Sequence, residues 1–542
     1  MASLKGKVVI ITGASSGIGC QTAIEFAKLG SKLVICGRNM ENLRKTFDSC
    51  IAEGLKESEV LMVQAEMGKD EDLKKIIDEC VAKFGQIDVL INNAGLLRYN
   101  SVESISMDEY DELFRVNTRA VVYLSHLATP YLTKVKGNIV VVSSVSALRS
   151  FAGILGYCMS KAAVDQFVRC SAIELASKQV RVNSVNPGVV ETEIHKRSGM
   201  DEATYRNYLV HCKTTHPLGR PGELEEVSKT ITFLASDTAS FITGASIPID
   251  GGRHSLLLTA HHPQLPGFSS GKLAFTVQLS LKIMASLKGK VVVITGASSG
   301  IGCQTAIEFA KLGSKLVICG RNMENLKKTF DSCIAEGLKE SEVLMVQAEM
   351  GKDEDLKEII NECVAKFSQI DVLVNNAGLL HKGSIENLSM DEYDEQFRVN
   401  TRAVVYLSHL ATPYLTKVKG NIVVVSSVNG IRSFPNVLGY CMSKAAVDQF
   451  VRCSAIELAS KQVRVNSVNP GVVKTEIHKR GGMDEEAYKN FLEHCKTTHA
   501  LGRPGEVEEV AKTITFLASD AASFITGASI PIDGGRHALC PR

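Results

Sequence analysis

The sequence predicts an α/β protein made of two tandem domains, each with a doubly wound parallel sheet. The main observation is an internal repeat: residues 1–254 recur as residues 284–537, at a constant offset of 283 positions and without insertion or deletion. Within each copy, short runs rich in Val and Ile alternate with helical patterns, and a glycine-rich turn follows the first run. A period of this length is far beyond that of a solenoid unit, so each copy must be a whole domain.

We expect the first domain to span residues 1–254, a linker to span 255–283 and the second domain to span 284–542. The linker carries His-His-Pro, Leu-Pro-Gly and Ser-Ser-Gly, which are turn signals. It would reach about 100 Å if fully extended and roughly 30 Å as a flexible coil, so the copies could pack together or stay apart. The second copy begins with the same Met-Ala-Ser-Leu-Lys-Gly-Lys as the first, which suggests a recent fusion of two adjacent genes or a gene model that joined them wrongly.

The composition is that of a globular protein, with 45% hydrophobic and 22% charged residues. The 61 basic and 59 acidic residues leave a formal net charge of +2, which gives no electrostatic reason to expect a nucleic acid or an anionic membrane as a partner. The first apolar run is too short for a signal peptide, and no run approaches the roughly 20 apolar residues of a membrane span. We therefore expect a cytoplasmic protein with its 15 cysteines reduced. None of them has a zinc-ligand spacing, so we expect no metal site.

The alternation of elements gives the expected layout of each copy. The expected strands of copy 1 are residues 7–12, 32–36, 60–63, 89–91, 139–142 and 180–185. The expected helices are residues 17–29, 41–52, 70–84 and 110–132. Such alternation implies a parallel sheet covered by helices on both faces. A sheet of this kind binds ligands beyond the C-terminal ends of its strands, where the strand order reverses.

The turn after the first strand is the first candidate binding site. Its glycines let the backbone approach a pyrophosphate closely, and the following helix offers N–H groups to the phosphate charge. The strand before it and the helix after it make a dinucleotide site the favoured interpretation, with a purely structural turn as the alternative. The residues assigned to this site are Thr12, Gly13, Ser15, Ser16, Gly17, Ile18 and Gly19.

The end of the second strand indicates which dinucleotide is preferred. An NAD enzyme usually carries an acidic residue there, which accepts a hydrogen bond from the ribose 2′-hydroxyl. This chain has Arg38 and Asn39 instead, with no acid before Glu41. A guanidinium suits a 2′-phosphate, so we expect NADP(H) to be preferred, with NAD(H) still possible. The alternative is that Arg38 is an ordinary solvated surface residue.

A second set of polar residues follows later strands. Asn93, Ala94 and Gly95 follow the fourth strand, and Ser143 and Ser144 end the fifth. Tyr157 and Lys161 then lie four residues apart, on one face of a helix. An ammonium near a phenol favours the phenolate and lowers its pKa, so the tyrosine could exchange a proton with a carbonyl or an alcohol near neutral pH.

Together these motifs resemble the short-chain dehydrogenase/reductase superfamily in its single-domain Rossmann form. Thr12-Gly-x-x-x-Gly-x-Gly19, Asn92-Asn-Ala-Gly95, Ser144, Tyr157 and Lys161 match the family pattern in order, and the resemblance spans nearly all of each copy. It implies further site residues: Asn117 as a proton-relay asparagine, and Pro187, Gly188, Val190 and Thr192 around the nicotinamide carboxamide. The family usually places an aspartate near the adenine, whereas this chain offers Glu66.

The resemblance also implies a role for each residue. Tyr157 is the general acid in reduction and the base in oxidation, and Ser144 stabilises charge on the substrate oxygen, although Ser143 is the alternative. Lys161 lowers the pKa of the tyrosine and holds the nicotinamide ribose, and Asn117 positions a water that links Lys161 to solvent. The cofactor supplies the hydride, and the protein supplies orientation and electrostatics.

The second copy keeps the same set, so we expect both halves to be competent. Its catalytic residues are Asn400, Ser427, Tyr440 and Lys444. Its cofactor residues are Gly296, Ser298, Ser299, Gly300, Ile301, Gly302, Arg321, Glu349, Asn376, Ala377, Gly378, Tyr440, Lys444, Pro470, Gly471, Val473 and Thr475.

Substrate choice is expected from the loops above the sheet, residues 96–101, 146–154 and 193–216. The residues expected to form an apolar pocket are Leu96, Leu97, Phe151, Ile154, Leu155 and Met200. The copies differ in these loops, for example Arg98-Tyr99-Asn100 against His381-Lys382-Gly383, which predicts overlapping but unequal substrate ranges, with neutral drift as the alternative. Three histidines in the third loop (His195, His211 and His216) are interpreted as loop residues rather than metal ligands.

These observations predict an NAD(P)-dependent carbonyl reductase or alcohol dehydrogenase with two active sites per chain. Two alternatives stay open: a nucleotide-binding regulatory or scaffold protein without turnover, and an epimerase or dehydratase of the same fold. Relatives usually form dimers or tetramers through helices near residues 110–132 and 157–177, so we expect the copies to pair within one chain or the chain to form homo-oligomers.

Overall fold

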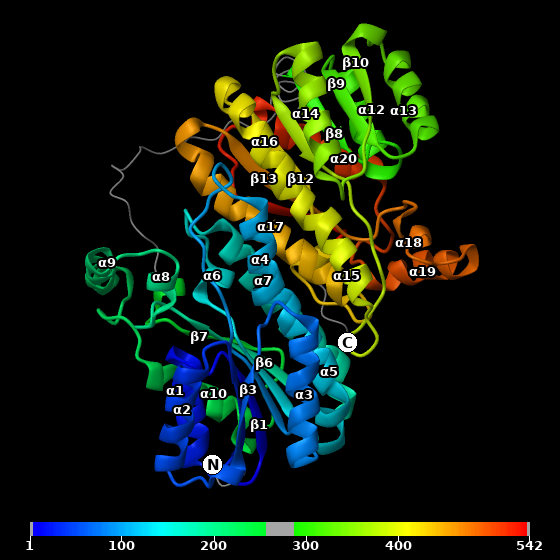
Figure 1. The fold of residues 1–542 in the computed structure, drawn as a ribbon. Coiled ribbons are helices and arrows are strands. Elements are labelled where there is room, and N and C mark those ends of the chain that lie inside the picture. The colour runs from blue at the N-terminus through cyan, green and yellow to red at the C-terminus, as the bar shows by residue number, and fades with distance from the viewer. Residues whose placement is uncertain (1–3, 256–286, 539–542) are drawn as a thin grey trace, which may run out of the picture.

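The computed structural model describes residues 4–255 and 287–538 (Figure 1). All of the expected linker except its first residue lies outside the described residues. The described chain forms two bodies, one from each copy of the repeat, and each is built around its own parallel sheet. No helix among the described residues is long and apolar enough to cross a bilayer.

Both sheets have seven parallel strands in the same order, β3-β2-β1-β4-β5-β6-β7 and β10-β9-β8-β11-β12-β13-β14, which confirms the expected fold class. The strands of copy 1 are β1 (Val8–Thr12), β2 (Lys32–Gly37), β3 (Val60–Gln64), β4 (Val89–Asn92), β5 (Asn138–Val142), β6 (Arg181–Pro187) and β7 (Ser246–Ile249). The strands of copy 2 are β8 (Val291–Thr295), β9 (Lys315–Gly320), β10 (Val343–Gln347), β11 (Val372–Asn375), β12 (Asn421–Val425), β13 (Arg464–Pro470) and β14 (Ser529–Ile532). In each sheet the order reverses at the first strand, which pairs with both the second and the fourth.

The helices cover both faces of each sheet. Those of copy 1 are α1 (Gly17–Lys28), α2 (Met40–Ala52), α3 (Asp70–Phe84), α4 (Met107–Phe114), α5 (Ala120–Val135), α6 (Val145–Leu148), α7 (Leu155–Leu175), α8 (Ile194–Arg197), α9 (Glu202–Thr215) and α10 (Leu224–Ala235). Those of copy 2 are α12 (Gly300–Lys311), α13 (Met323–Ala335), α14 (Asp353–Phe367), α15 (Met390–Phe397), α16 (Ala403–Val418), α17 (Leu438–Leu458), α18 (Ile477–Arg480), α19 (Glu485–Thr498) and α20 (Val507–Ala518). Short 3₁₀ turns are η2 (Glu57–Glu59), η4 (Ala176–Lys178), η5 (Asp237–Ala239), η6 (Arg253–Ser255), η7 (Glu340–Glu342), η9 (Val428–Gly430), η10 (Ala459–Lys461) and η11 (Asp520–Ala522).

The predicted strands of copy 1 are all present, with ends displaced by no more than two residues, a normal uncertainty for element ends. One helix prediction was wrong in detail. The single helix expected over residues 110–132 is instead α4 and α5, separated by a π-helical turn at Arg115–Arg119. Such turns are rare and occur mostly at functional sites, and this one carries Asn117. Copy 2 has the same turn at Arg398–Arg402.

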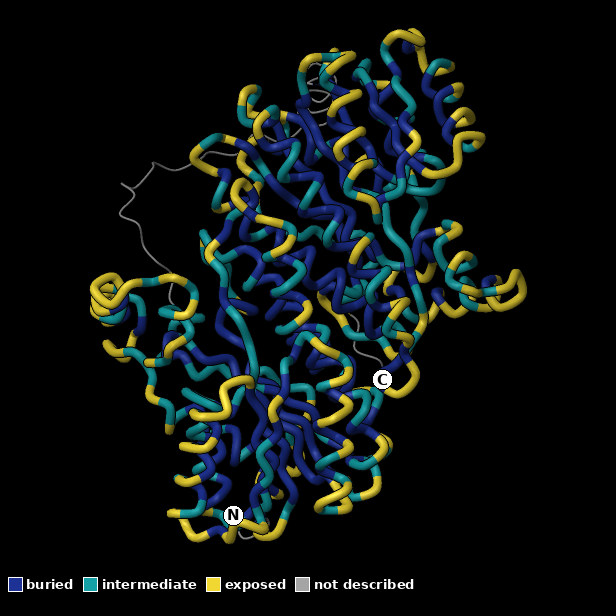
Figure 2. The backbone as a smooth tube through the Cα atoms, in the orientation of Figure 1, coloured by how far each residue is buried: buried dark blue, intermediate teal, exposed yellow. Residues whose placement is uncertain are grey.

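One hydrophobic core passes through both copies. On one face of each sheet the buried side chains form a separate cluster within that copy. On the other face the buried side chains of both copies belong to a single cluster, which includes Phe167 of α7 and Phe450 of α17. These helices run between the two sheets together with α4 and α15 (Figure 1), and the buried backbone is continuous across that region (Figure 2).

Polar contacts between the copies are reciprocal. The Arg119 guanidinium bonds Asp70 of its own copy and, at 2.9 Å, Asp394 of the other, and Arg402 mirrors this arrangement. The rings of Phe114 and Phe397 lie 5.7 Å apart between them. The two halves of one chain therefore pack as an intrachain pair, through the helices that were expected to form such a contact.

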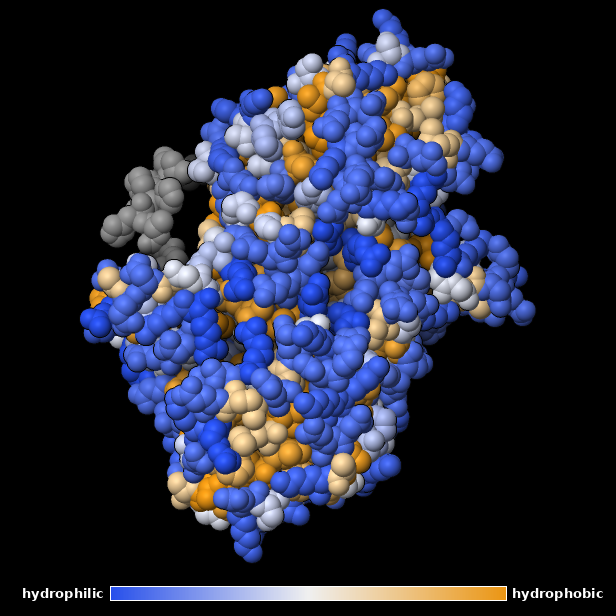
Figure 3. Space-filling view, in the orientation of Figure 1, coloured by the Kyte–Doolittle hydropathy of each residue, from blue (hydrophilic) through white to orange (hydrophobic). Residues whose placement is uncertain are grey.

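The face shown in Figure 3 is mainly hydrophilic.

Candidate active site

The glycine-rich turn after β1 adopts a backbone that only glycine tolerates readily. Gly13 and Gly17 have φ values of +64° and +56°, in the left-handed region. A Cβ atom on Gly13 would lie 2.9 Å from the Cα atom of Ala94, so no larger residue fits between this turn and the segment after β4. The turn ends at the N-terminus of α1, where free N–H groups favour an anion such as a phosphate.

Asn93 fastens the turn to the neighbouring strand. Its Nδ2 donates hydrogen bonds to the carbonyl oxygens of Thr12 at 2.8 Å and Gly13 at 3.2 Å, and its own N–H donates to Thr12 Oγ1 at 3.0 Å. A Cβ atom on Gly19 would lie 2.4 Å from both Asn93 Nδ2 and the Gly13 carbonyl oxygen. The conformation of the turn is therefore fixed by Thr12, Gly19 and most of the Asn93 side chain, which pack against its backbone on the side away from the cavity.

Each copy has one long cavity at this edge of the sheet, of about 800 Å³ in copy 1 and about 940 Å³ in copy 2. Both cavities run from the end of the second strand, past the glycine turn, to the tyrosine. The expected cofactor residues that line the first are Gly13, Ser15, Ser16, Gly17, Ile18, Arg38, Asn39, Glu66, Asn93, Ala94, Gly95, Tyr157, Lys161, Pro187, Gly188, Val190 and Thr192. In copy 2 every expected cofactor residue except Gly302 lines the equivalent cavity, and so does Ser427.

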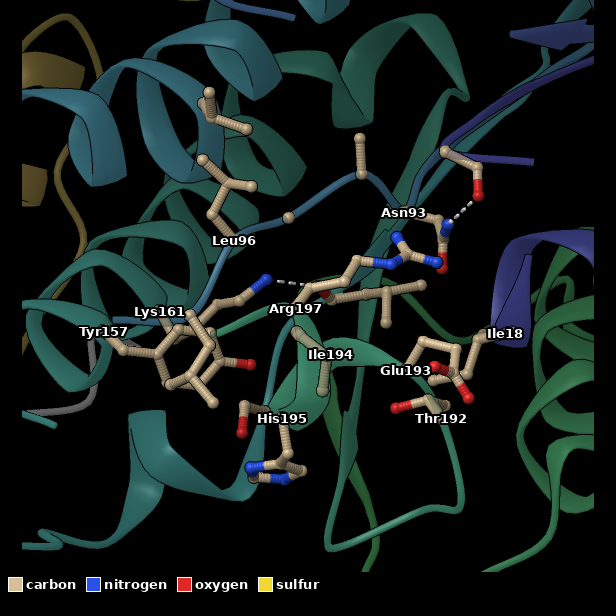
Figure 4. Close-up of a pocket in the computed structure, with 18 of the residues that line it drawn as sticks. Ile18, Asn93, Leu96, Tyr157, Lys161, Thr192, Glu193, Ile194, His195 and Arg197 are labelled. Carbon is tan, nitrogen blue, oxygen red and sulfur yellow. Dashed lines mark hydrogen bonds between the residues drawn. The ribbon is translucent and has the colours of Figure 1, made fainter. Parts of the chain in front are cut away.

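Tyr157 lies at the far end of the cavity (Figure 4). Its hydroxyl shares a side-chain hydrogen bond with Ser144. Burial raises the pKa of Tyr157 to about 12, and the Ser144 hydroxyl lowers it only in part. The direction is opposite to the expected one, because the loss of hydration outweighs the polar neighbours. Tyr440 has the same pKa of about 12, again raised by burial and partly lowered by Ser427.

Lys161 lies one helical turn after Tyr157. Its Nζ donates a hydrogen bond to the Val142 carbonyl oxygen at 2.9 Å and lies 5.7 Å from the centre of the Tyr157 ring. Burial lowers the pKa of Lys161 to about 8, against the opposing effect of the Asp165 carboxylate. The lysine is therefore mostly charged at neutral pH but loses its proton far more readily than an exposed lysine.

Asn117 is fully buried beside this lysine. Its Oδ1 accepts from the Leu96 N–H at 2.7 Å, and its Nδ2 donates to the Leu96 carbonyl oxygen at 2.9 Å and to Ser160 Oγ at 3.1 Å. A Cβ atom on Gly95 would lie 3.4 Å from Asn117 Oδ1 and 3.5 Å from Lys161 Nζ, so both polar atoms border one small space. Asn117 does not line the main cavity, and Asn400 has equivalent bonds in copy 2.

The geometry distinguishes the two adjacent serines. Ser144 pairs with Tyr157, whereas Ser143 Oγ turns back to donate to the Lys161 carbonyl oxygen at 3.4 Å. Asn186 links the backbone of Ser144 to a buried carboxylate. Its Nδ2 donates to the Ser144 carbonyl oxygen at 3.0 Å and to Asp165 at 2.7 Å. Sequence reasoning missed Asn186, near the end of β6, and Asp165, within α7.

Three of the expected cofactor residues, Arg38, Asn39 and Glu66, lie at the end of the cavity next to β2 and β3. Two of them bond to residues close to them in the chain. Arg38 is exposed at the rim of the cavity. Asn39 uses its Oδ1 to cap α2, by accepting from the Asn42 N–H at 2.9 Å. The Glu66 carboxylate pairs with Lys69 at 3.1 Å. Among these three described residues, only Arg38 has a side chain without a local hydrogen bond or ion pair of this kind.

Arg197 is a residue that sequence reasoning missed. It ends α8, in the loop above the sheet, and its Nη2 donates to Ser16 Oγ in the glycine turn. Arg480 donates to Ser299 in the same way, at 2.8 Å. Figure 4 shows Arg197 between Tyr157 and Lys161 on one side and Ile18 and Thr192 on the other. The basic run at residues 195–197 was the available signal.

The expected apolar pocket is largely present. Five of the six expected residues line the cavity of copy 1, namely Leu96, Leu97, Phe151, Ile154 and Met200. The prediction was wrong for Leu155, which is fully buried in the core at the start of α7. Leu155 begins a helix whose first residue here turns toward the core, and the spacing of apolar residues alone does not reveal that direction.

The mouths of the two cavities differ in charge. In copy 1 the Tyr99 hydroxyl bonds His195 Nδ1 at 2.9 Å, and the His195 ring lies 4.8 Å from that of Tyr208. In copy 2 Lys382 takes the place of Tyr99 and lines the cavity. Burial lowers the pKa of His478 to about 4, and the Lys382 charge contributes to that shift. Copy 2 therefore has one more cation in the wall of its cavity, whereas the cation of the same loop in copy 1, Arg98, pairs with Glu112 and does not line the cavity.

The other loop histidines have local bonding partners. His216 is buried, and its Nε2 accepts from the Val189 N–H at 3.3 Å while its Nδ1 bonds the Cys212 carbonyl oxygen at 2.9 Å. His211 bonds Thr214 on its own helix. Within residues 4–255 and 287–538, no three His, Cys, Asp or Glu side chains are grouped as metal ligands.

Comparison with known proteins agrees with this geometry. A family model described as enoyl-(acyl carrier protein) reductase matches residues 13–254 and again residues 296–537. Since these matches span most of the chain, the protein belongs to the short-chain dehydrogenase/reductase family, as two tandem copies.

The individual relatives match one copy at a time. The chain is 39% identical over 252 residues to the 3-oxoacyl-[acyl-carrier-protein] reductase FabG of Thermotoga maritima, covering 46% of this chain and 98% of that protein. It is 34% identical over 259 residues to versicolorin reductase 1 of Dothistroma septosporum, covering 46% of this chain and 96% of that protein. A solved short-chain dehydrogenase/reductase of unknown function from Caenorhabditis elegans, determined with cofactor, is 37% identical, with a TM-score of 0.46 and coverage of 47% of this chain and 97% of that one.

Proposed function

We propose that this protein is an NAD(P)-dependent oxidoreductase with two active sites, which transfers a hydride between a nicotinamide cofactor and a carbonyl or alcohol substrate. The observation that carries the proposal is the position of Tyr157, Ser144 and Lys161 at the end of a dinucleotide-sized cavity, with Asn117 buried beside Lys161. The same arrangement recurs in copy 2. Two complete sets argue against a silent scaffold half, since such a half has no need of the buried lysine and asparagine.

The residues present fit a bound dinucleotide. The left-handed glycines leave the backbone open for a pyrophosphate at the N-terminus of α1, and Arg197 adds a cation beside Ser16. Arg38 lies at the rim where a 2′-phosphate would reach, and no acidic residue occupies that place, so we infer a preference for NADP(H). A reduced nicotinamide, when bound, supplies the hydride.

The protein's own groups then perform the proton transfer. Ser144 orients the substrate oxygen next to the Tyr157 hydroxyl and stabilises the charge that develops on it. With its pKa raised to about 12, Tyr157 is protonated at neutral pH and is prepared to donate. Lys161 carries a positive charge beside the tyrosine and eases loss of that proton, and Asn117 borders the space through which a replacement proton can reach it.

The first test is consumption of NADPH and NADH with a panel of ketones and aldehydes, followed by the absorbance of the reduced nicotinamide. The wild type is compared with Tyr157→Phe, Tyr440→Phe and the double variant. Turnover that falls in each single variant and disappears in the double variant would support two working sites. Tight NADPH binding without turnover on any carbonyl would favour a regulatory protein, and a changed substrate without net NADPH oxidation would favour an epimerase or dehydratase.

A further inference from the structure

Each copy places one carboxylate against the backbone of the other copy. Glu457, near the end of α17, accepts hydrogen bonds from the Val102 N–H at 2.8 Å and the Gly153 N–H at 3.2 Å, both in copy 1. Glu174 of α7 accepts in the same way from the Ile385 N–H at 2.8 Å and the Asn436 N–H at 3.1 Å, both in copy 2. Each carboxylate thus joins two separate loops of the opposite copy.

In copy 1, the loops that Glu457 holds form the walls of the substrate end of the cavity. They are bonded to each other, because the Asn100 N–H donates to the Gly153 carbonyl oxygen at 2.8 Å and the Leu155 N–H donates to the Asn100 carbonyl oxygen at 3.0 Å. The residues on either side of Gly153, Ala152 and Ile154, line the cavity. Helix α7 begins one residue later and carries the catalytic tyrosine in its first turn.

A histidine of copy 2 forms a second hydrogen bond with the backbone of Val102. While Glu457 holds the Val102 N–H, His409 Nδ1 bonds its carbonyl oxygen at 2.8 Å. In the reciprocal contact His126 Nδ1 bonds the Ile385 carbonyl oxygen at 2.6 Å. Both backbone polar groups of Val102, and likewise of Ile385, are therefore bonded by the other copy.

The contact uses only backbone atoms of the loops, so it survives differences in loop sequence. Val102 is replaced by Ile385, and Gly153 by Asn436, yet the bonds recur. Asn436 has a φ of +61°, a left-handed conformation that is uncommon outside glycine. The hydrogen bond that the Asn436 N–H donates to Glu174 helps to hold that conformation. Asn436 itself lines the cavity of copy 2.

We propose that Glu457 and Glu174 are positioning residues that set the substrate pocket in trans, so that each active site is complete only when the other copy is docked against it. The proposal rests on the proposed oxidoreductase function, because it assigns these loops to the substrate. It gives the tandem arrangement a physical purpose: the second copy is a structural part of the first active site as well as a second site.

The protonation of Glu457 is linked to the loop contact. Burial raises its pKa to about 7, the nearby Glu103 raises it further, and the two backbone N–H groups lower it. The other polar groups that face it are the thiols of Cys158 and Cys453 and, on the Val102 peptide, His409, while Glu103 itself is paired with Lys461. The N–H groups favour the ionised form, but burial is the larger effect, so the pKa with the loops attached lies above that of an exposed glutamate and the attached state as a whole favours the protonated carboxyl. The loops are therefore held less firmly above pH 7 than below it.

The experiment measures one active site at a time. In the Tyr440→Phe background only copy 1 turns over, and Glu457→Gln is then added in copy 2. The amide keeps one acceptor but sets an NH₂ group against the second N–H, so we expect the substrate KM of copy 1 to rise about tenfold, with a much smaller change in kcat. In the Tyr157→Phe background, Glu174→Gln should have the same effect on copy 2. Exposed Glu336, far from either cavity, provides a matched control as Glu336→Gln.

Two further readouts separate positioning from a general loss of structure. The KM of copy 1 should rise as the pH is raised through about 7 when Glu457 is present, because ionisation weakens the attachment of the loops, and Glu457→Gln should remove that dependence. Amide hydrogen exchange should become faster in residues 100–103 and 151–155 of copy 1 and stay unchanged in the equivalent loops of copy 2.

The exchange readout does not require turnover, so it distinguishes the two proposals. Absence of carbonyl turnover in the wild type, with the expected exchange pattern, would remove the oxidoreductase function and leave the trans attachment standing. Normal exchange in copy 1 loops, or a KM effect of Glu457→Gln on copy 2 instead of copy 1, would overturn the trans positioning.

Discussion

The glycine turn offers the sharpest quantitative prediction, at Gly19. An alanine there would place its Cβ atom 2.4 Å from both Asn93 Nδ2 and the Gly13 carbonyl oxygen, closer than atoms can approach. The Asn93 side chain must then move and lose its bonds to the Thr12 and Gly13 carbonyl oxygens, of 2.8 and 3.2 Å. The Gly13 carbonyl belongs to the backbone of the turn, so the turn itself must shift.

These effects can be weighed against each other. Two lost hydrogen bonds cost about 2 kcal/mol, and forcing an extra methyl into a packed site costs about 1–3 kcal/mol. Alanine is favoured over glycine in a helix by about 1 kcal/mol, and Gly19 lies in the first turn of α1. We therefore expect Gly19→Ala to destabilise copy 1 by about 2–4 kcal/mol and to weaken cofactor binding with it.

The assay is thermal inactivation of copy 1 turnover in the Tyr440→Phe background, with the NADPH KM measured in parallel. The inactivation temperature should fall by roughly 5–15 °C. Gly302→Ala in the Tyr157→Phe background is a matched replicate, because its Cβ atom would meet Asn376 Nδ2 at 2.4 Å. Asn93→Ala should reduce the cost of Gly19→Ala when the two are combined. A Gly19→Ala protein that is as stable as the wild type, or more stable, would show that helix propensity dominates and would refute this reasoning.

Three other predictions concern the active sites. Arg38→Ala should raise the NADPH KM of copy 1 about tenfold or more and leave the NADH KM unchanged, because it removes a charge-assisted bond to the 2′-phosphate; equal changes with both cofactors would contradict the assignment. Lys382→Tyr, in the Tyr157→Phe background, should remove any preference of copy 2 for anionic over neutral ketones, measured as a ratio of kcat/KM values, and an unchanged ratio would show that Lys382 does not meet the substrate. The rate of carbonyl reduction by either copy should decline as the pH rises past about 8, where Lys161 loses its charge, and a pH profile that stays flat to pH 10 would place the lysine outside the proton path.

Much of the fold followed from local pattern. The repeat, the alternation of strands with helices and the parallel sheet are encoded in periodicities of a few residues, which the sequence displays directly. The glycine turn and the Tyr157–Lys161 spacing are equally local, because a helix places residues four apart on one face whatever surrounds it. These motifs also sufficed to recognise the family and to predict which strand ends meet at the cavity.

Other features depended on contacts between distant segments. The reach of Arg197 to Ser16 and the inward turn of Leu155 are set by side-chain direction, which spacing does not determine. The preference for Ser144 over Ser143, by contrast, was already favoured by its spacing from Tyr157. The pKa of Tyr157 moved opposite to the expected direction because burial, a property of the whole fold, outweighed the neighbouring lysine.

The difference between what the sequence determines and what only the tertiary structure decides is clearest at the interface of the copies. The sequence determined that each repeat carries its own full set of the family's motifs, since every motif of the first copy recurs in the second. Only the tertiary structure decided that a carboxylate of one copy holds the pocket loops of the other, across 355 positions in the case of Glu457 and Val102. Its partners are backbone N–H groups, which every residue except proline carries, so no side-chain pattern in the sequence marks the contact.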